Sequence, residues 1–212
     1  MPEFSILYAD EALLVLDKPA GLLCVPGKGE DKQDCLSGRV QQVYEDARVV
    51  HRLDMATSGL LVMARGASAQ RSMNDAFASR QIHKRYVAVV DGLLAPPAAA
   101  WGVIDLPILQ DWPNRPRRII DPQGKPSITH WRVLQHNPTE QTTRVELEPV
   151  TGRSHQLRVH LQALQHAIVG DALYGTQASL AKAGRLLLHA TRLELAHPVS
   201  GQAMVFSSEP PF

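Results

Sequence analysis

Residues 51–59 read HRLDMATSG, and residues 60–64 continue as LLVMA. Thr, Ser and Gly favour turns and caps, whereas a short apolar run bounded by Gly59 is typical of a buried strand. The sequence therefore predicts a turn that carries Arg52 and Asp54, followed at once by a core strand over 59–65. A carboxylate beside buried apolar residues is costly unless a cation pairs with it. Asp54 is thus either an ordinary residue of a solvated loop or a functional group.

Strand patterns outnumber helix patterns in the rest of the chain. Two short strands are expected within 5–21, and further strands at 84–92, 143–150, 186–198 and 203–208. Helices are expected at 34–45, at 68–81, where apolar residues recur at helical spacing, and after Ser154, a residue type common at helix N-caps. Frequent turns between these segments favour a mixed α+β fold around a large, mainly antiparallel sheet.

Composition narrows the class of protein. The chain has 212 residues, of which 44% are hydrophobic and 20% charged, so we expect a folded core. The formal net charge is only +1, so a nucleic-acid partner would have to be recognised by a local patch. Cys24 and Cys35 are expected to be reduced thiols of a cytoplasmic protein. No apolar run approaches the roughly 20 residues of a membrane span, and the N-terminus lacks the pattern of a secretory signal.

Several kinds of chemistry lack their sequence signals. His155 and His160 are five residues apart, so on a helix they point in different directions, and no metal site is expected. No G-x-S-x-G motif indicates a serine hydrolase, and no glycine-rich phosphate loop indicates a nucleotide cofactor. A glycoside hydrolase would use paired carboxylates, whereas only Asp54 lies in a motif.

Basic residues gather at three places. Arg153, in TGRSH, precedes an expected helix and is a candidate partner for Asp54, because a guanidinium binds a carboxylate with two hydrogen bonds. The segment DWPNRPRR combines an indole with cations, which suits stacking on an unpaired base together with phosphate contacts; it contains Trp112, Arg115, Arg117 and Arg118. Lys84 and Arg85 precede Tyr86, which is otherwise expected to be a core tyrosine. Each of these groups can also be interpreted as ordinary residues of a surface loop or of the core.

Taken together, these segments resemble the RluA family of pseudouridine synthases. The resemblance is carried by HRLDMATSGLLVMAR, KRYVAVV, GKPSITHW, LEPVTGRSHQLRVHL, GDALYG and RLLLHA, in this order, and covers about residues 7–206. It implies one catalytic domain over residues 1–212, without an S4 domain, with a central RNA-binding cleft. The implied activity is the isomerisation of uridine to pseudouridine in RNA stem-loops, which requires no cofactor.

The resemblance also implies roles for individual residues. Asp54 matches the catalytic aspartate, Tyr86 the tyrosine that packs on the target base, and Arg153 the basic partner of the aspartate. Arg52 matches the arginine that enters the RNA stack, and Leu188 the apolar lining of the pocket. His51, which opens the motif, is grouped with these RNA-binding residues.

The segment DWPNRPR (111–117) resembles the arm that binds the RNA stem-loop in members acting on both 23S rRNA uridine 746 and tRNA uridine 32. These members imply 23S rRNA and tRNA anticodon stem-loops as partners, no membrane contact and a monomer. Two alternatives are a synthase that acts on rRNA or tRNA alone, and a non-catalytic RNA-binding module of the same fold.

Overall fold

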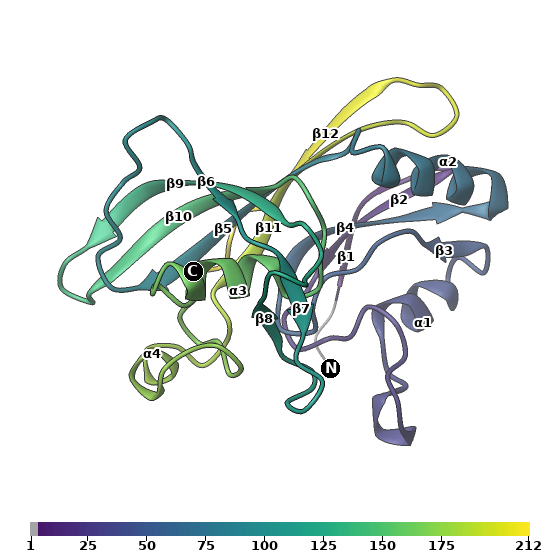
Figure 1. Cartoon of the computed structure of the whole chain (residues 1–212). Helices are drawn as coiled ribbons and strands as arrows, with labels where there is room; N and C mark the ends of the chain where they lie inside the picture. Colours follow the sequence, from purple (N-terminus) through teal and green to yellow (C-terminus); the bar gives the residue numbers. More distant parts are fainter. Residues whose placement is uncertain (1–3) are drawn as a thin grey trace. The chain divides into compact units, whose positions relative to one another are not determined.

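The structure, a computed structural model, describes residues 4–212. The chain forms two compact units. Unit 1 contains the chain up to Lys84 together with His189–Pro211, and unit 2 contains Arg85–Leu188 with Phe212. In Figure 1 the colours of unit 1 are purple, blue and yellow, and those of unit 2 are teal and green. Unit 2 is therefore nearly one continuous run of the chain, whereas unit 1 is built from both of its ends.

Unit 1 is organised around a mixed sheet. Its strands are β1 (Ser5–Ala9), β2 (Leu13–Lys18), β3 (Ala47–Val49), β4 (Ser58–Arg65), β11 (Leu188–Ala196) and β12 (Ala203–Ser207). Strand β2 pairs antiparallel with β1 and β4, and β3 also pairs antiparallel with β4. Strand β11 runs parallel to β4 and antiparallel to β12. A mixed sheet is thus present, as the sequence predicts.

Strand β4 is the centre of this sheet and explains the apolar run that follows Asp54. Every residue from Ser58 to Ala64 is buried, because β4 has partner strands on both edges. Gly59 has φ +106°, and a Cβ at this position would lie 2.4 Å from the carbonyl oxygen of Ala190 on β11. Only glycine permits this approach of β4 to β11.

Three helical segments complete unit 1: α1 (Leu36–Gln41), α2 (Gly66–Ala78) and the 3₁₀ turn η1 (Glu30–Lys32). Helix α2 confirms the helix expected at 68–81, and it buries Ala69 and Met73 while its other residues are largely solvent-facing. The thiol of Cys35 caps α1 by accepting a hydrogen bond from the N–H of Gly38.

Unit 2 is organised around an antiparallel sheet in the order β5, β10, β9, β6. Its strands are β5 (His83–Asp91), β6 (Gly102–Asp105), β9 (Ile128–Asn137) and β10 (Thr142–Pro149), with a separate hairpin of β7 (Ile108–Gln110) and β8 (Arg118–Ile120). Its helices are α3 (Gln156–Ala163) and α4 (Gln177–Ala181). Strands β5 and β10 confirm the sequence prediction.

Two local expectations at α3 are wrong. The N-cap of α3 is His155 rather than Ser154, and His155 adopts a left-handed conformation with φ 58° and no side-chain cap. Leu157, Leu161 and Leu164 share one face of the helical pattern, which predicts that Arg158 points outward or into a cleft. Arg158 is instead buried in an ion pair. Strand β9 and helix α4 have no counterpart among the predicted elements. The α+β class is confirmed, while the expectation of a single catalytic domain stays a prediction.

Candidate functional site

Asp54 lies in a tight turn that leads into β4. The N–H of Thr57 donates to the carbonyl of Asp54 at 3.1 Å and closes the turn. The carboxylate is half-buried, while Arg52 and Met55 on either side are exposed. The carboxylate of Asp54, just before the buried strand β4, is therefore held on a short, hydrogen-bonded turn rather than on a long loop.

The far side of this turn is fixed by a buried cation. The carbonyl of Met55 accepts from the N–H of Gly21 at 2.8 Å and from Nζ of Lys18 at 3.1 Å. Lys18 is fully buried, and its ammonium also donates to the carbonyls of Pro19 and Leu22, both at 2.8 Å. Such a charge is tolerated in the core because carbonyl oxygens replace its water. Lys18 thus connects the end of β2 to the turn of Asp54.

His51 opens the motif and serves the fold of unit 1. Its Nε2 accepts the N–H of Val62 at 3.0 Å, and its ring packs against Phe77 with centroids 4.7 Å apart. Burial, aided by the nearby charge of Lys84, lowers the pKa of His51 to about 3. The imidazole is therefore neutral at physiological pH. Its assignment to RNA binding stays a prediction, and it brings no positive charge to that role.

A chain of polar side chains joins the start of β4 to distant parts of unit 1. Ser58 and Nδ1 of His189 are 2.8 Å apart, and Nε2 of His189 is 3.0 Å from the hydroxyl of Ser208. Ser208 donates to the carboxylate of Asp17. Because an ionised carboxylate only accepts, Ser208 accepts from Nε2–H, and Nδ1 accepts from Ser58. The motif is thereby connected to β2, β11 and the segment after β12.

Two further candidate residues are buried on strands. Tyr86 is 9% exposed on β5, opposite Leu147 of β10. Leu188 is 3% exposed at the first residue of β11. Both positions fit an apolar lining, but burial alone equally fits an ordinary core residue.

Arg153 is exposed on a loop that a single buried amide organises. Oε1 of Gln156 accepts from the N–H of Arg153 at 3.0 Å and from the hydroxyl of Thr151 at 2.8 Å. Nε2 of Gln156 donates to the carbonyl of Ile128 and the hydroxyl of Thr129. Gln156 satisfies all these bonds from the first turn of α3 and sets the direction of the loop. Sequence reasoning missed Gln156, because its partners Ile128 and Thr129 lie 28 and 27 residues earlier in the chain.

An ion pair beneath the same loop connects it to the GDALYG motif. Arg158 and Asp171, both buried, form a two-pronged pair with both distances 2.7 Å. The guanidinium lies 5.1 Å from the ring centroid of Tyr174, whose hydroxyl is 2.7 Å from Nδ1 of His155 and accepts the N–H of Arg118 at 2.8 Å. Burial raises the pKa of Tyr174, so its phenol stays neutral and shares a hydrogen bond with His155. The TGRSH loop and the β7–β8 hairpin thus share one anchor.

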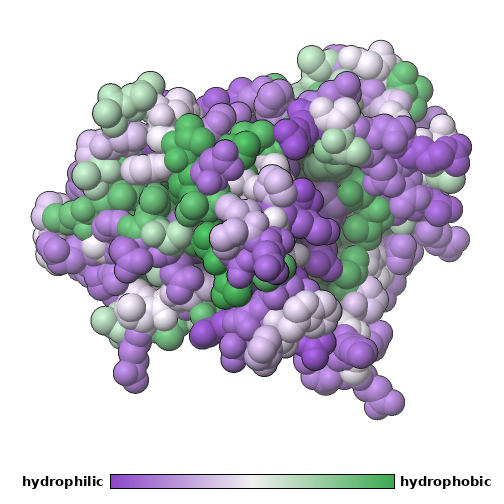
Figure 2. Space-filling model, viewed as in Figure 1, coloured by the Kyte–Doolittle hydropathy of each residue, from purple (hydrophilic) through white to green (hydrophobic). Residues whose placement is uncertain are grey.

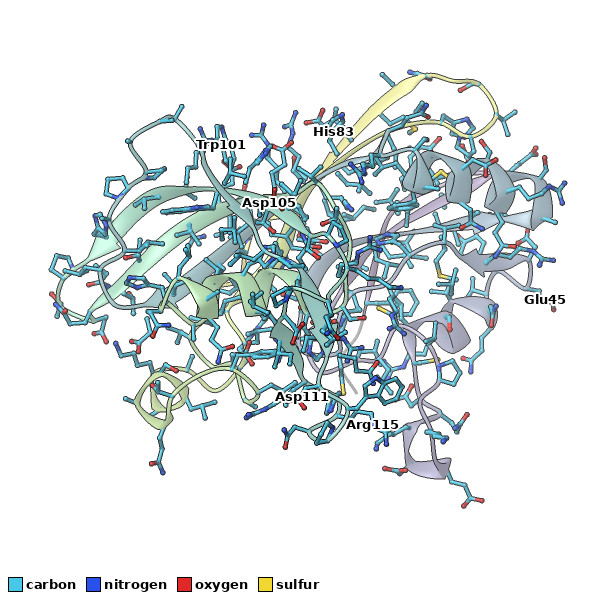
Figure 3. The ribbon with its side chains drawn as sticks, viewed as in Figure 1. Glu45, His83, Trp101, Asp105, Asp111 and Arg115 are labelled. Carbon is cyan, nitrogen blue, oxygen red and sulfur yellow. The ribbon has the colours of Figure 1, made fainter. Side chains whose placement is uncertain are left out.

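The basic segment predicted to contact RNA forms the tip of the β7–β8 hairpin. Arg115, Arg117 and Trp112 are exposed, and the Arg115 guanidinium lies 5.1 Å from the centroid of the Trp112 indole. Figure 3 places Arg115 and Asp111 together at this tip, and Figure 2 shows the tip in purple and pale colours without a green patch. Arg118, half-buried, begins β8. The tip offers a cationic and aromatic surface.

The structure describes no metal centre within residues 4–212, where no group of three or more His, Cys, Asp or Glu side chains is placed to hold an ion. Cys24 and Cys35 are both buried and not disulfide-bonded. Over the same range, no helix has both the length and the apolar character needed to cross a bilayer.

Comparison with known proteins shows the family to which this chain belongs. The family model described as RNA pseudouridylate synthase matches residues 12–163. The chain belongs to the RNA pseudouridylate synthase family. The matched range includes the turn of Asp54, strand β5 with Tyr86, the basic hairpin tip and the loop of Arg153.

Curated relatives match this chain over its full given length. The chain is 45% identical over 212 residues to "Dual-specificity RNA pseudouridine synthase RluA" of Escherichia coli (strain K12), and the match covers 100% of this chain and 95% of that protein. A protein of the same name from Haemophilus ducreyi is 43% identical over the same length, again with 100% and 95% coverage.

A solved structure, "Human RNA Pseudouridylate Synthase Domain Containing 1", matches with TM-score 0.81 and 30% identity, covering 99% of this chain and 84% of its own. A second human structure, "Human RNA Pseudouridylate Synthase Domain Containing 4", has TM-score 0.76 at 25% identity, with coverage of 97% and 88%. The protein is an RNA pseudouridine synthase, an isomerase that acts on RNA.

Proposed function

We propose that Asp54 is the catalytic carboxylate of this synthase. The observation that supports this most directly is its turn, in which the carbonyls of Asp54 and Met55 are both hydrogen-bonded and the carboxylate stands half-buried beside the core. A reacting group gains most when it is held in one orientation before the substrate arrives. Asp54 meets that requirement, since its backbone is tied to β4 and to buried Lys18.

The reaction breaks the bond between N1 of uracil and C1′ of the ribose, turns the base, and joins C5 to C1′. The hydrogen on C5 leaves as a proton, so the atoms are rearranged without oxidation or reduction. A carboxylate can start this sequence by attacking C1′, by attacking C6 of the base, or by removing the proton at C2′. All three routes require Asp54 ionised and next to the sugar.

Other residues follow from the family resemblance as proposals. By this resemblance, Arg153 is the basic partner proposed for Asp54, and Tyr86 packs on the uracil, with Leu188 among the apolar residues that exclude water. The exposed loop position of Arg153 and the buried strand positions of Tyr86 and Leu188 suit these roles. The roles stay predictions until variants are measured.

RNA recognition is assigned to the exposed cations. Arg52 enters the stack that the target uridine leaves, and thereby offsets part of the few kcal/mol that unstacking costs. The hairpin tip with Trp112, Arg115 and Arg117 contacts an unpaired loop, where RNA-binding proteins read most sequence information. Arg118 supports the tip through its bond to Tyr174.

The substrates we propose are uridine 746 of 23S rRNA and uridine 32 of tRNA anticodon stem-loops. The support is the dual specificity in the names of relatives that are 43–45% identical over the whole chain. A monomer working in the cytoplasm is proposed on the same ground. The alternative of a synthase that acts on rRNA alone or on tRNA alone predicts pseudouridine in only one of these RNA classes.

The test uses RNA stem-loops labelled with tritium at uracil C5, because rearrangement releases this label to water. The wild type is expected to release tritium, and Asp54→Asn to release it at least about a thousandfold more slowly. Asp75→Asn is the matched control, since Asp75 is an exposed aspartate on α2 of the same unit. Asp54→Asn that is folded and turns over at the wild-type rate would overturn the assignment.

The substrate proposal needs a separate measurement. RNA from cells lacking the gene is treated with the wild-type protein, and pseudouridine is mapped in 23S rRNA and tRNA. Modification at both uridines is expected. Modification of only one RNA class would refute the dual specificity and leave the role of Asp54 untouched.

A further inference from the structure

The loop between β2 and α1 forms hydrogen bonds with Leu53, the residue immediately before Asp54. The thiol of Cys24 lies 3.1 Å from the carbonyl oxygen of Leu53, to which it donates, and 3.2 Å from the N–H of Leu53, from which it accepts. One side chain therefore satisfies both backbone groups of one residue. Leu53 and Cys24 are buried, so these contacts are shielded from water.

The residue immediately after Asp54 is held from the same side: Gly21 of this loop and Lys18 at the end of β2 both donate to the carbonyl of Met55. Together with the bond from Thr57 to the carbonyl of Asp54, the three consecutive carbonyls of residues 53–55 each have a partner. Cys24 supplies the contacts on the N-terminal side of this clamp. The thiol of Cys24 forms no disulfide, and among residues 4–212 it belongs to no group of side chains placed to hold a metal ion.

Cys24 is itself firmly placed. The N-terminal turn of α1 donates to the backbone of the loop, from Ser37 to the carbonyl of Cys24 at 3.1 Å and from Leu36 to the carbonyl of Leu23 at 2.7 Å. Burial raises the pKa of the thiol, so it stays protonated at neutral pH and keeps a hydrogen to donate. A rigid helix start is thus connected through one sulfur to the backbone of the motif.

We propose that Cys24 is a positioning residue for Asp54: its thiol fixes the main chain at Leu53 and so sets the direction in which the carboxylate points. The inference rests on the proposed catalytic role of Asp54. Thiol hydrogen bonds are weak individually, but a displacement of about 1 Å at a reacting group costs on the order of a hundredfold in rate. A partial loosening is expected to cost less.

The experiment compares Ala and Ser substitutions at both cysteines. Cys35 is the matched control, because it is also buried and its thiol also makes polar contacts, but with Ser37 and Gly38 of α1 rather than with residues 53–55. For each variant, single-turnover tritium release at saturating labelled stem-loop, the RNA dissociation constant and the thermal midpoint are measured. Asp54→Asn is run in parallel.

Cys24→Ala is expected to lower the single-turnover rate about tenfold, with the RNA dissociation constant within about twofold of the wild type. Cys24→Ser, which can still donate and accept, is expected to recover most of the rate, and Cys35→Ala to lose less than about twofold. A rate loss in Cys35→Ala equal to that in Cys24→Ala would reduce Cys24 to a stability role and overturn the proposal.

Two further outcomes separate this inference from the proposed function. If Asp54→Asn is inactive while Cys24→Ala turns over at the wild-type rate, the positioning role fails and the catalytic assignment stands. If Asp54→Asn is fully active, the catalytic assignment itself fails. If Cys24→Ala does not fold, the test uses Cys24→Ser instead. A single-turnover rate of Cys24→Ser below about a third of the wild-type rate would then refute the proposal.

Discussion

Neutral His51 predicts a loss of stability in weak acid. The folded protein holds the pKa of His51 at about 3, whereas the ordinary value is 6.5, which the unfolded chain is expected to show. Because the unfolded chain then binds the proton more tightly, the stabilising contribution is complete above pH 6.5 and is lost progressively as the pH falls toward 3. His51→Gln removes the titrating group, and its amide oxygen can still accept from the N–H of Val62.

The magnitude follows from these two pKa values. Between pH 7.5 and pH 5.0, the difference in proton binding at His51 amounts to about 2 kcal/mol of unfolding free energy. His51→Gln is expected to begin less stable at pH 7.5, because it loses the ring contact with Phe77. Its further loss on going to pH 5.0 should be about 2 kcal/mol smaller than that of the wild type.

Urea unfolding at the two pH values measures this difference directly. His83→Gln is the matched control, since it makes the same substitution at an exposed histidine on β5. The remaining histidines are the same in all three proteins, so their contributions cancel in the comparison. Equal acid losses in the wild type and His51→Gln would show that the imidazole is not held neutral, and would refute the reasoning.

Three more predictions concern the supports of the site and its contact with RNA. Asp171→Asn leaves the buried guanidinium of Arg158 uncompensated and should cost about 3–5 kcal/mol in urea unfolding; a loss below about 1 kcal/mol would contradict this. Ser208→Ala removes the partner of Nε2 of His189 and should cost about 1–3 kcal/mol, seen as a lower thermal midpoint, whereas an unchanged midpoint would count against the polar chain. Arg117→Ala should weaken RNA binding and reduce the slope of log affinity against log salt by about 0.7–0.9; an unchanged slope would mean that Arg117 contacts no phosphate.

Much of the sheet could be predicted from local sequence. Strands β4, β5, β10 and β11 were predictable because each is an apolar or alternating run bounded by turn residues, and α2 because its buried residues recur at helical spacing. Helix α4 is only five residues long, too short for a periodic pattern. The cap of α3 could not be assigned, because His155 occupies an unusual left-handed conformation beside Tyr174.

The motif that carries Asp54 was also predictable, but its supports were not. A sequence pattern can indicate that residues 51–59 form a turn before a buried strand, as it does. It cannot indicate that Cys24 and Lys18 hold that turn, since these contacts join residues 29 and 37 positions apart. Likewise, Arg158 is buried because Asp171 lies against it, and helical periodicity contains no information about such a partner.

The order in which the two units can be completed during synthesis follows from how the chain is divided between them. Unit 2 is essentially one continuous stretch, 85–188, whereas unit 1 waits for β11 and β12 near the C-terminus. Until these strands are synthesised, β4 has antiparallel partners but lacks its parallel neighbour, so an apolar edge stays open next to the turn of Asp54. The N-terminal unit, although translated first, is therefore the last to be completed. Chains broken off before residue 188 carry the whole HRLDMATSG motif on an unfinished and aggregation-prone sheet.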